Sequence, residues 1–235
     1  MKLLVIVLLG WTAMMVRSPG GSIDWGTAFN DELYDAGGSP LTAAFEFEMG
    51  TFSGGFVPTL ANSGAWESQW KAMETASFNA PMQYVAENSI LTSNGPDLIW
   101  ERDQTGDEEA ALSNPHLFAP GETVYVWAFN SKTLTEATQW ALVTGAGATL
   151  DTDWTLSAAL GDPVATTRQW RLSNADLSIV GGLHDLRGPG SYDATPASFT
   201  LQTTLMVPIP EPGSSVLLVF AAVLSLRRRP PFHPS

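Results

Sequence analysis

Two glutamates separated by one residue are the first candidates for chemistry in this sequence. Glu46 and Glu48 lie in the run AFEFEMGTF (44–52), where apolar and acidic residues alternate. In an extended strand two such side chains share one face about 7 Å apart, a separation at which paired carboxylates can cleave glycosidic bonds. Alternating glutamates more often form the solvated face of a strand. We adopt that interpretation and expect no catalysis from this pair.

Two acidic segments are candidates for calcium binding. The segment DQTGDEE, from Asp103 to Glu109, carries four carboxylates, and Asp151 and Asp153 add two more. Calcium prefers several oxygen ligands from flexible loops, but neither segment has the ligand spacing of an EF-hand. We predict solvated acidic loops and no required cofactor, and keep calcium as an alternative.

The histidines give little support to nucleophilic or zinc catalysis. His116 and His184 precede the C-terminal tail, and neither belongs to a GxSxG or HExxH motif. Asp185 follows His184 directly, but neighbouring residues of a strand point to opposite faces. Both histidines are therefore expected at the surface or in loops. The chain has no cysteine, which excludes disulfides and thiolate chemistry, and it has no glycine-rich nucleotide loop.

Tryptophans offer a different chemistry, the stacking of aromatic rings on sugars. Five of them lie in predicted strands: Trp100, Trp127, Trp140, Trp154 and Trp170. Most should belong to the core, because indole rings are readily buried. One or two exposed rings would be enough for a carbohydrate-binding module, and the sequence does not select among the five.

The elements that position these residues are mainly strands. Period-two alternation and turn signals rich in Gly and Pro predict strands at 44–52, 83–92, 97–101, 122–129, 138–144, 153–157, 168–173, 176–180 and 198–207. Many short strands at fairly even spacing favour an antiparallel β-sandwich or a jelly-roll-like fold. One short amphipathic helix is predicted over 65–76, where Trp66, Trp70 and Met73 recur at helical spacing.

Charge separates the middle of the chain from its ends. The 235 residues carry 24 acidic and 11 basic side chains, and five of the basic ones lie before residue 23 or after residue 212. Residues 23–212 therefore have a formal charge of −18, from six Lys and Arg against 24 Asp and Glu. Such a domain repels nucleic acid and anionic lipid, so we expect no nucleic-acid partner.

The N-terminus is typical of a secretory signal. Lys2 is followed by the apolar run LLVIVLLGWTAMMV (3–16) and then by the small residues Gly20, Gly21 and Ser22. A basic start, an apolar run of this length and a small-residue exit predict a signal peptide over 1–22 with a mature chain from about Ile23. A β-rich extracellular domain is then expected over 23–207.

The C-terminal segment 208–235 combines three features in a fixed order. Pro210-Glu211-Pro212 precedes the apolar run VLLVFAAVLSL (216–226), and Arg227-Arg228-Arg229 follows it. The apolar run falls short of the roughly 20 residues of a comfortable membrane span. Arginines after it would stop transfer on the cytoplasmic side, so the sequence predicts a helix that holds the chain in the inner membrane only transiently.

These three features together resemble the PEP-CTERM sorting signal of Gram-negative bacteria. The resemblance implies that an exosortase-type protease recognises Pro210, Glu211 and Pro212 and removes the tail, leaving the protein at the cell surface or outside the cell. It also implies an association with exopolysaccharide and biofilm matrix. Segments 45–70 and 121–144 are similar to a recurrent type of PEP-CTERM protein from Verrucomicrobia-like bacteria, a resemblance that adds no chemistry.

The sequence thus favours an exported surface or matrix protein without catalytic activity. The alternative is a carbohydrate-binding module that uses exposed Trp, assisted by calcium. An acidic secreted hydrolase is the least favoured of the three hypotheses, because the mature domain lacks a convincing set of catalytic residues.

Overall fold

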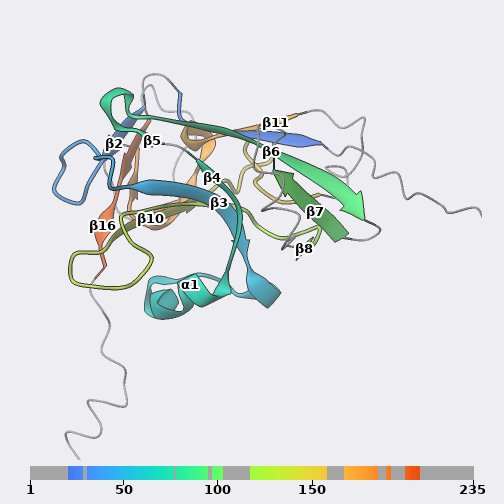
Figure 1. Ribbon diagram of the computed structural model, residues 1–235, viewed down its shortest axis with the longest axis horizontal. Helices are drawn as coiled ribbons and strands as arrows, with labels where there is room; N and C mark the ends of the chain where they lie inside the picture. The colour runs from blue at the N-terminus through green and yellow to red at the C-terminus, as the bar shows by residue number, and fades with distance from the viewer. Residues whose placement is uncertain are drawn as a thin grey trace, which may run out of the picture.

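β-Strands dominate the protein, whose computed structural model describes residues 21–28, 31–76, 78–94, 97–102, 117–157, 167–184, 189–191 and 199–206 (Figure 1). Two larger sheets and one small sheet are present, and most neighbouring strands in them run antiparallel. The predicted class, mainly β and sandwich-like with one short helix, is confirmed.

The first sheet joins strands that are distant in the sequence. Its order is β11-β1-β6-β7-β8, and β5 pairs with β6. The strands are β1 (Ser22–Gly26), β5 (Phe78–Asn79), β6 (Tyr84–Asn94), β7 (Asp97–Arg102), β8 (Leu117–Phe118) and β11 (Arg168–Arg171). β1 runs antiparallel to β6 but parallel to β11, so this sheet departs from the purely antiparallel expectation.

The second sheet has the order β14-β12-β10-β9-β3-β4, and β16 pairs with β10. Its strands are β3 (Glu46–Phe52), β4 (Trp70–Ala76), β9 (Tyr125–Phe129), β10 (Gln139–Thr144), β12 (Leu177–Val180), β14 (Gly190–Ser191) and β16 (Thr204–Leu205). The small third sheet has the order β13-β15-β2, with β2 (Glu32–Tyr34), β13 (Gly182–Leu183) and β15 (Thr200–Gln202).

The helical elements among the described residues are short. They comprise α1 (Trp66–Gln69) and the 3-10 turns η1 (Ser53–Gly55), η2 (Leu60–Ala65), η3 (Ala80–Met82) and η5 (Leu172–Asn174). A capping box begins η2, because the Thr59 and Asn62 side chains each accept a hydrogen bond from the other residue's backbone. Figure 1 shows α1 on the side of β3 that faces away from β6.

The second sheet is buried on both faces, because its central strands are apolar on both sides. In β9, Val126 and Ala128 belong to the main core, whereas Trp127 and Phe129 belong to a second core. The main core includes residues of all three sheets, among them Ile23, Trp25, Leu33, Phe47, Val126, Trp170 and Leu201. The second core, hereafter the aromatic cluster, is made of Phe52, Trp66, Trp127, Phe129, Trp140, Leu142, Val180 and Met206.

The helix predicted over 65–76 is wrong in its second half. α1 ends at Gln69, and Trp70 begins β4 with extended backbone (φ −73°, ψ 131°). β4 pairs along β3, so hydrogen bonds between strands replace the helical ones. Trp66 belongs to the aromatic cluster and Trp70 packs against it, but Met73 lies in the main core. The three residues therefore share no single helical face.

Most of the other predicted strands are confirmed, with two exceptions. The segment 153–157 forms no strand, and Asp153 and Thr155 make only isolated bridges to Ala146 and Thr123. The segment 198–207 divides into β15 and β16, which pair in different sheets.

Residues 1–20 of the predicted signal segment and the whole predicted sorting tail, 208–235, lie outside the described residues, as does residue 207. This includes the predicted signal and tail helices, the motif Pro210-Glu211-Pro212 and the arginines Arg227-Arg228-Arg229. Within the part of the chain that the structure describes, no helix has both the length and the hydropathy to cross a membrane.

Candidate functional site

An open groove of about 360 Å³ lies on the first sheet. Strand alternation creates it, because Trp25 and Trp170 point into the main core and leave their neighbours on the opposite face. The groove is lined by Asp24, Trp25, Gly26, Thr27, Tyr84, Gln169 and Arg171. Its volume lies in the range of small-ligand sites, ~300–1,000 Å³.

The parallel pairing of β1 with β11 brings the polar lining residues together. Asp24 lies opposite Gln169, and Gly26 lies opposite Arg171. Neighbouring strands are about 4.8 Å apart. The carboxylate of Asp24 on β1 therefore lies close to the amide of Gln169 and the guanidinium of Arg171 on β11. Gly26 has no side chain and a φ of 143°, a conformation that favours glycine. On β1, the lining position opposite Arg171 therefore has no side chain.

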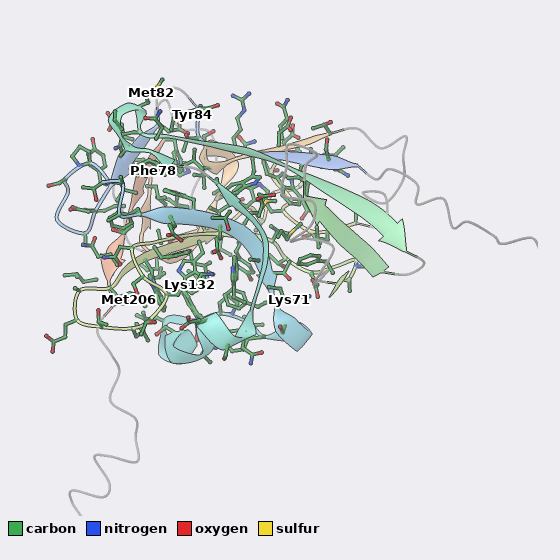
Figure 2. All side chains as sticks on the ribbon, in the orientation of Figure 1. Lys71, Phe78, Met82, Tyr84, Lys132 and Met206 are labelled. Atoms are coloured by element: carbon green, nitrogen blue, oxygen red, sulfur yellow. The ribbon has the colours of Figure 1, made fainter. Side chains whose placement is uncertain are left out.

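Tyr84 lines the groove from the start of β6, with 38% of its surface exposed. The preceding turn η3 holds it in place: the Gln83 side-chain amide donates to the carbonyl oxygens of Leu41 (2.9 Å) and Ala80 (2.7 Å). Met82 is 55% exposed, and Figure 2 shows Met82 and Tyr84 close together on the side of the molecule away from α1.

Thr27 closes the groove next to Tyr84 by pairing with the following residue of β6. The Thr27 backbone N–H donates to the Val85 carbonyl oxygen at 2.8 Å, and the Val85 N–H donates to the Thr27 hydroxyl at 2.9 Å. The Thr27 hydroxyl is therefore used in holding β1 to β6. The other polar lining groups are those of Asp24, Gln169 and Arg171.

The positive charge of Arg171, which lines the groove, also acts on the carboxyl group of Asp31. Burial raises the pKa of its carboxyl to about 6, opposed by a hydrogen bond from the Ala28 N–H and by the positive charge of Arg171. The Ala28 N–H donates to Asp31 Oδ2 at 2.6 Å. The charge of Arg171 thus acts on a buried carboxylate as well as on the groove.

This set of side chains can bind and orient a polar ligand. It offers an acceptor (Asp24), a donor (Arg171), a group that does both (Gln169) and an aromatic ring (Tyr84). Asp24 is the only carboxylate among the described lining residues, so these residues do not form the carboxylate pair of a glycosidase.

Glu46 and Glu48, the predicted pair of carboxylates, lie in different environments. Glu46 is exposed, but Glu48 is only 7% exposed. The ammonium of Lys132 lies 2.6 Å from Glu48 Oε2, and the Trp70 indole N–H donates to the same oxygen at 2.8 Å. The expected solvated face is therefore wrong for Glu48, because the aromatic cluster covers that face of β3.

The predicted tryptophans are core residues where the structure describes them. Trp127, Trp140, Trp154 and Trp170 are each at most 1% exposed, and the side chain of Trp100 lies outside the described ones. The indole N–H groups of Trp140, Trp154 and Trp170 donate to backbone carbonyl oxygens of nearby loops. These four rings are packed against protein and not against solvent.

His184 lies in a turn directly after β13, which agrees with the expected loop position, but it is buried and not at the surface. It is 1% exposed, has a left-handed backbone (φ 40°), and its Nε2 lies 3.1 Å from the Ala175 carbonyl oxygen. The Phe199 ring packs against it at 5.3 Å between centroids. His116 lies outside the described residues.

The acidic segments are only partly described. Asp151 and Asp153 lie in a turn, where Asp151 Oδ1 accepts a long hydrogen bond of 3.4 Å from the Gln169 N–H. Residues 103–109 lie outside the described part. Among described side chains, no three His, Asp or Glu come together in a metal-binding group.

Sequence reasoning missed the groove residues Asp24, Tyr84, Gln169 and Arg171. The predicted strand at 168–173 places Gln169 and Arg171 on one face, but nothing in the sequence indicates that this strand pairs with β1, about 145 positions earlier. Comparison of the chain with protein-family models, with curated proteins and with solved structures finds no match. The function is therefore argued from the residues of the chain.

Proposed function

We propose that this chain is an exported cell-surface or extracellular-matrix protein whose β domain acts by binding and not by catalysis. The observation that carries the proposal is the ordered C-terminal combination of Pro210-Glu211-Pro212, the apolar run 216–226 and Arg227-Arg228-Arg229, together with the signal features of residues 1–22. An exosortase-type protease is the processing partner, and the inner membrane holds the chain only during export.

The described fold supports this division of the chain. β1 begins at Ser22, one residue before the predicted start of the mature domain, and Met206 is buried one residue before its predicted end at 207. Two hydrophobic cores lie between these limits. A chain without cysteine can therefore stabilise an extracellular domain by burial alone.

The test replaces Pro210, Glu211 and Pro212 by alanine in the full chain, expressed in a bacterium that has an exosortase-type protease. The wild-type protein should lose its tail and leave the inner-membrane fraction, whereas the triple variant should keep the tail and remain there. Mass spectrometry of each fraction measures the result. A control variant with Pro230→Ala and Pro231→Ala, beyond the arginines, should be processed normally. Unchanged processing of the triple variant would refute the proposal.

The alternative function is carbohydrate binding through exposed Trp. None of Trp127, Trp140, Trp154 and Trp170 is exposed. The groove on the first sheet favours the same function with other residues. Its ring is Tyr84, and its polar groups are those of Asp24, Gln169 and Arg171.

A further inference from the structure

We propose that the groove formed by Asp24, Gly26, Tyr84, Gln169 and Arg171 binds a short segment of a neutral saccharide. This inference rests on the proposed export, since only an exported domain meets the polysaccharide of a matrix. It assigns to the β domain a ligand class and a set of residues other than the tryptophans.

The hydrogen-bonding character of the groove suits hydroxyl groups. Each sugar hydroxyl both donates and accepts, so it is best satisfied where donors and acceptors lie side by side. Across β1 and β11, Asp24 lies opposite Gln169, and Gly26 lies opposite Arg171. The carboxylate of Asp24 accepts hydrogen bonds, the guanidinium of Arg171 donates them, and the amide of Gln169 does both. The carboxylate and the guanidinium are planar and can each contact two adjacent hydroxyls.

Tyr84 supplies the apolar part of such a site. A pyranose ring has an apolar C–H face, which packs on an aromatic ring while its hydroxyls bond at the edge. Tyr84 is 38% exposed at the rim of the groove, and Met82 next to it is 55% exposed.

Charge selects the kind of saccharide. The described lining residues include one carboxylate and one guanidinium, whose charges balance each other. The domain as a whole has a formal charge of −18 over residues 23–212, which repels a polyanionic glycan at long range. A neutral polymer avoids this repulsion and still uses both charged groups as hydrogen-bond partners.

The groove is also preformed. Its lining residues come from β1, β6 and β11 or adjoin them, and hydrogen bonds join these three strands along the sheet. Gln83 fixes the turn before Tyr84, and Thr27 fixes the end of β1 to β6. A rigid site loses little conformational entropy when it binds, which suits a weak ligand such as a single sugar segment.

The test is affinity gel electrophoresis of the full chain as purified from cells, in gels that contain one polysaccharide each. The panel holds three neutral polymers (a mixed-linkage β-glucan, a galactomannan and a xylan), one anionic polymer (alginate) and one cationic polymer (chitosan). At least one neutral polymer should retard the wild-type protein. Tyr84→Ala and Gln169→Ala should each weaken that binding about tenfold, the equivalent of ~1.4 kcal/mol.

Two further variants make the outcome specific. Tyr84→Phe keeps the ring and should bind within about twofold of wild type, a difference below ~0.5 kcal/mol. Val57→Ala removes a 69% exposed apolar side chain next to η2, away from the groove, and should bind like wild type. Circular dichroism of each variant verifies that the fold is intact.

Several outcomes would overturn the inference. They are the absence of binding to all three neutral polymers, binding that Tyr84→Ala and Gln169→Ala leave unchanged, and retardation by alginate or chitosan alone. The gel assay measures polysaccharide binding by purified protein, whereas tail processing is measured in cell fractions. A failure of the groove proposal can therefore be distinguished from a failure of the export proposal.

Discussion

The ion pair of Glu48 and Lys132 provides the sharpest test of the packing at the aromatic cluster. Glu48 Oε2 accepts from the Trp70 indole and lies 2.6 Å from the Lys132 ammonium. That ammonium also lies over the rings of Trp127 and Phe129, at 5.8 and 5.1 Å from their centroids. Glu48→Ala would leave the ammonium and the indole N–H without this acceptor against an aromatic surface.

The expected loss follows from the burial of the two side chains. Removing one partner of a fully buried ion pair costs ~3–5 kcal/mol, but the Lys132 side chain is 26% exposed and water can solvate part of its charge. The lost indole hydrogen bond adds about 1 kcal/mol. Glu48→Ala should therefore lower the free energy of unfolding by about 2–4 kcal/mol. Glu48→Gln keeps an acceptor for Trp70 and should lose about half as much.

The assay is urea denaturation of the full chain, followed by tryptophan fluorescence, at neutral pH and moderate salt. Glu46→Ala is the matched control, because Glu46 lies two residues earlier in the same strand and is exposed. It should change the free energy of unfolding by less than about 0.5 kcal/mol. If Glu48→Ala and Glu46→Ala have equal effects, the packing described for this face of β3 is wrong.

Two other substitutions test the packing of the second sheet at Gly50 and the charge of Asp31, which precedes β2. Gly50→Ala should destabilise the protein by about 2–3 kcal/mol in urea, because the added Cβ would meet the carbonyl oxygen of Lys71 in β4, whereas Gly64→Ala has room and should be nearly neutral. The pKa of Asp31 is raised to about 6 from 3.8, so its ionisation increasingly opposes folding as pH rises from about 4 to 6, and stability should rise by about 1–2 kcal/mol as pH falls from 7 to 4. Asp31→Asn should remove this contribution, and parallel pH–stability curves for variant and wild type would contradict it.

Local patterns predict most of the strands but not their partners. β3 alternates apolar and acidic residues at its start, whereas β9 and β10 are almost continuous apolar runs, and each of the three lies within its predicted segment. Alternation alone does not reveal that both faces are covered, because a Glu on a strand looks the same whether water or an aromatic cluster lies above it. The alternation therefore predicts a solvated Glu48, whereas its burial depends on Trp70 and Lys132, which are distant in the sequence.

The helix and the groove show the same limit in two other ways. Trp66 and Trp70 have helical spacing, but the pairing of β4 with β3 overrides it after Gln69. The groove depends on β1, β6 and β11, which are separated by some 60 to 145 positions and meet only through sheet pairing. A binding site assembled in this manner has no motif of consecutive residues that a sequence could display.

The end of the β domain links the fold to the proposed processing. Met206 is 1% exposed in the aromatic cluster, and its N–H donates to the Thr138 carbonyl oxygen at 2.7 Å. Pro210 follows four residues later, so cleavage at the sorting motif would leave this anchor in the mature protein. Met206→Ala should cost about 2–4 kcal/mol in urea denaturation of the processed protein, whereas Leu205→Ala, at a side chain that is 50% exposed, should cost little. Equal stability of the two variants would mean that the domain ends before Met206 and that the sorting motif is further from the fold than proposed.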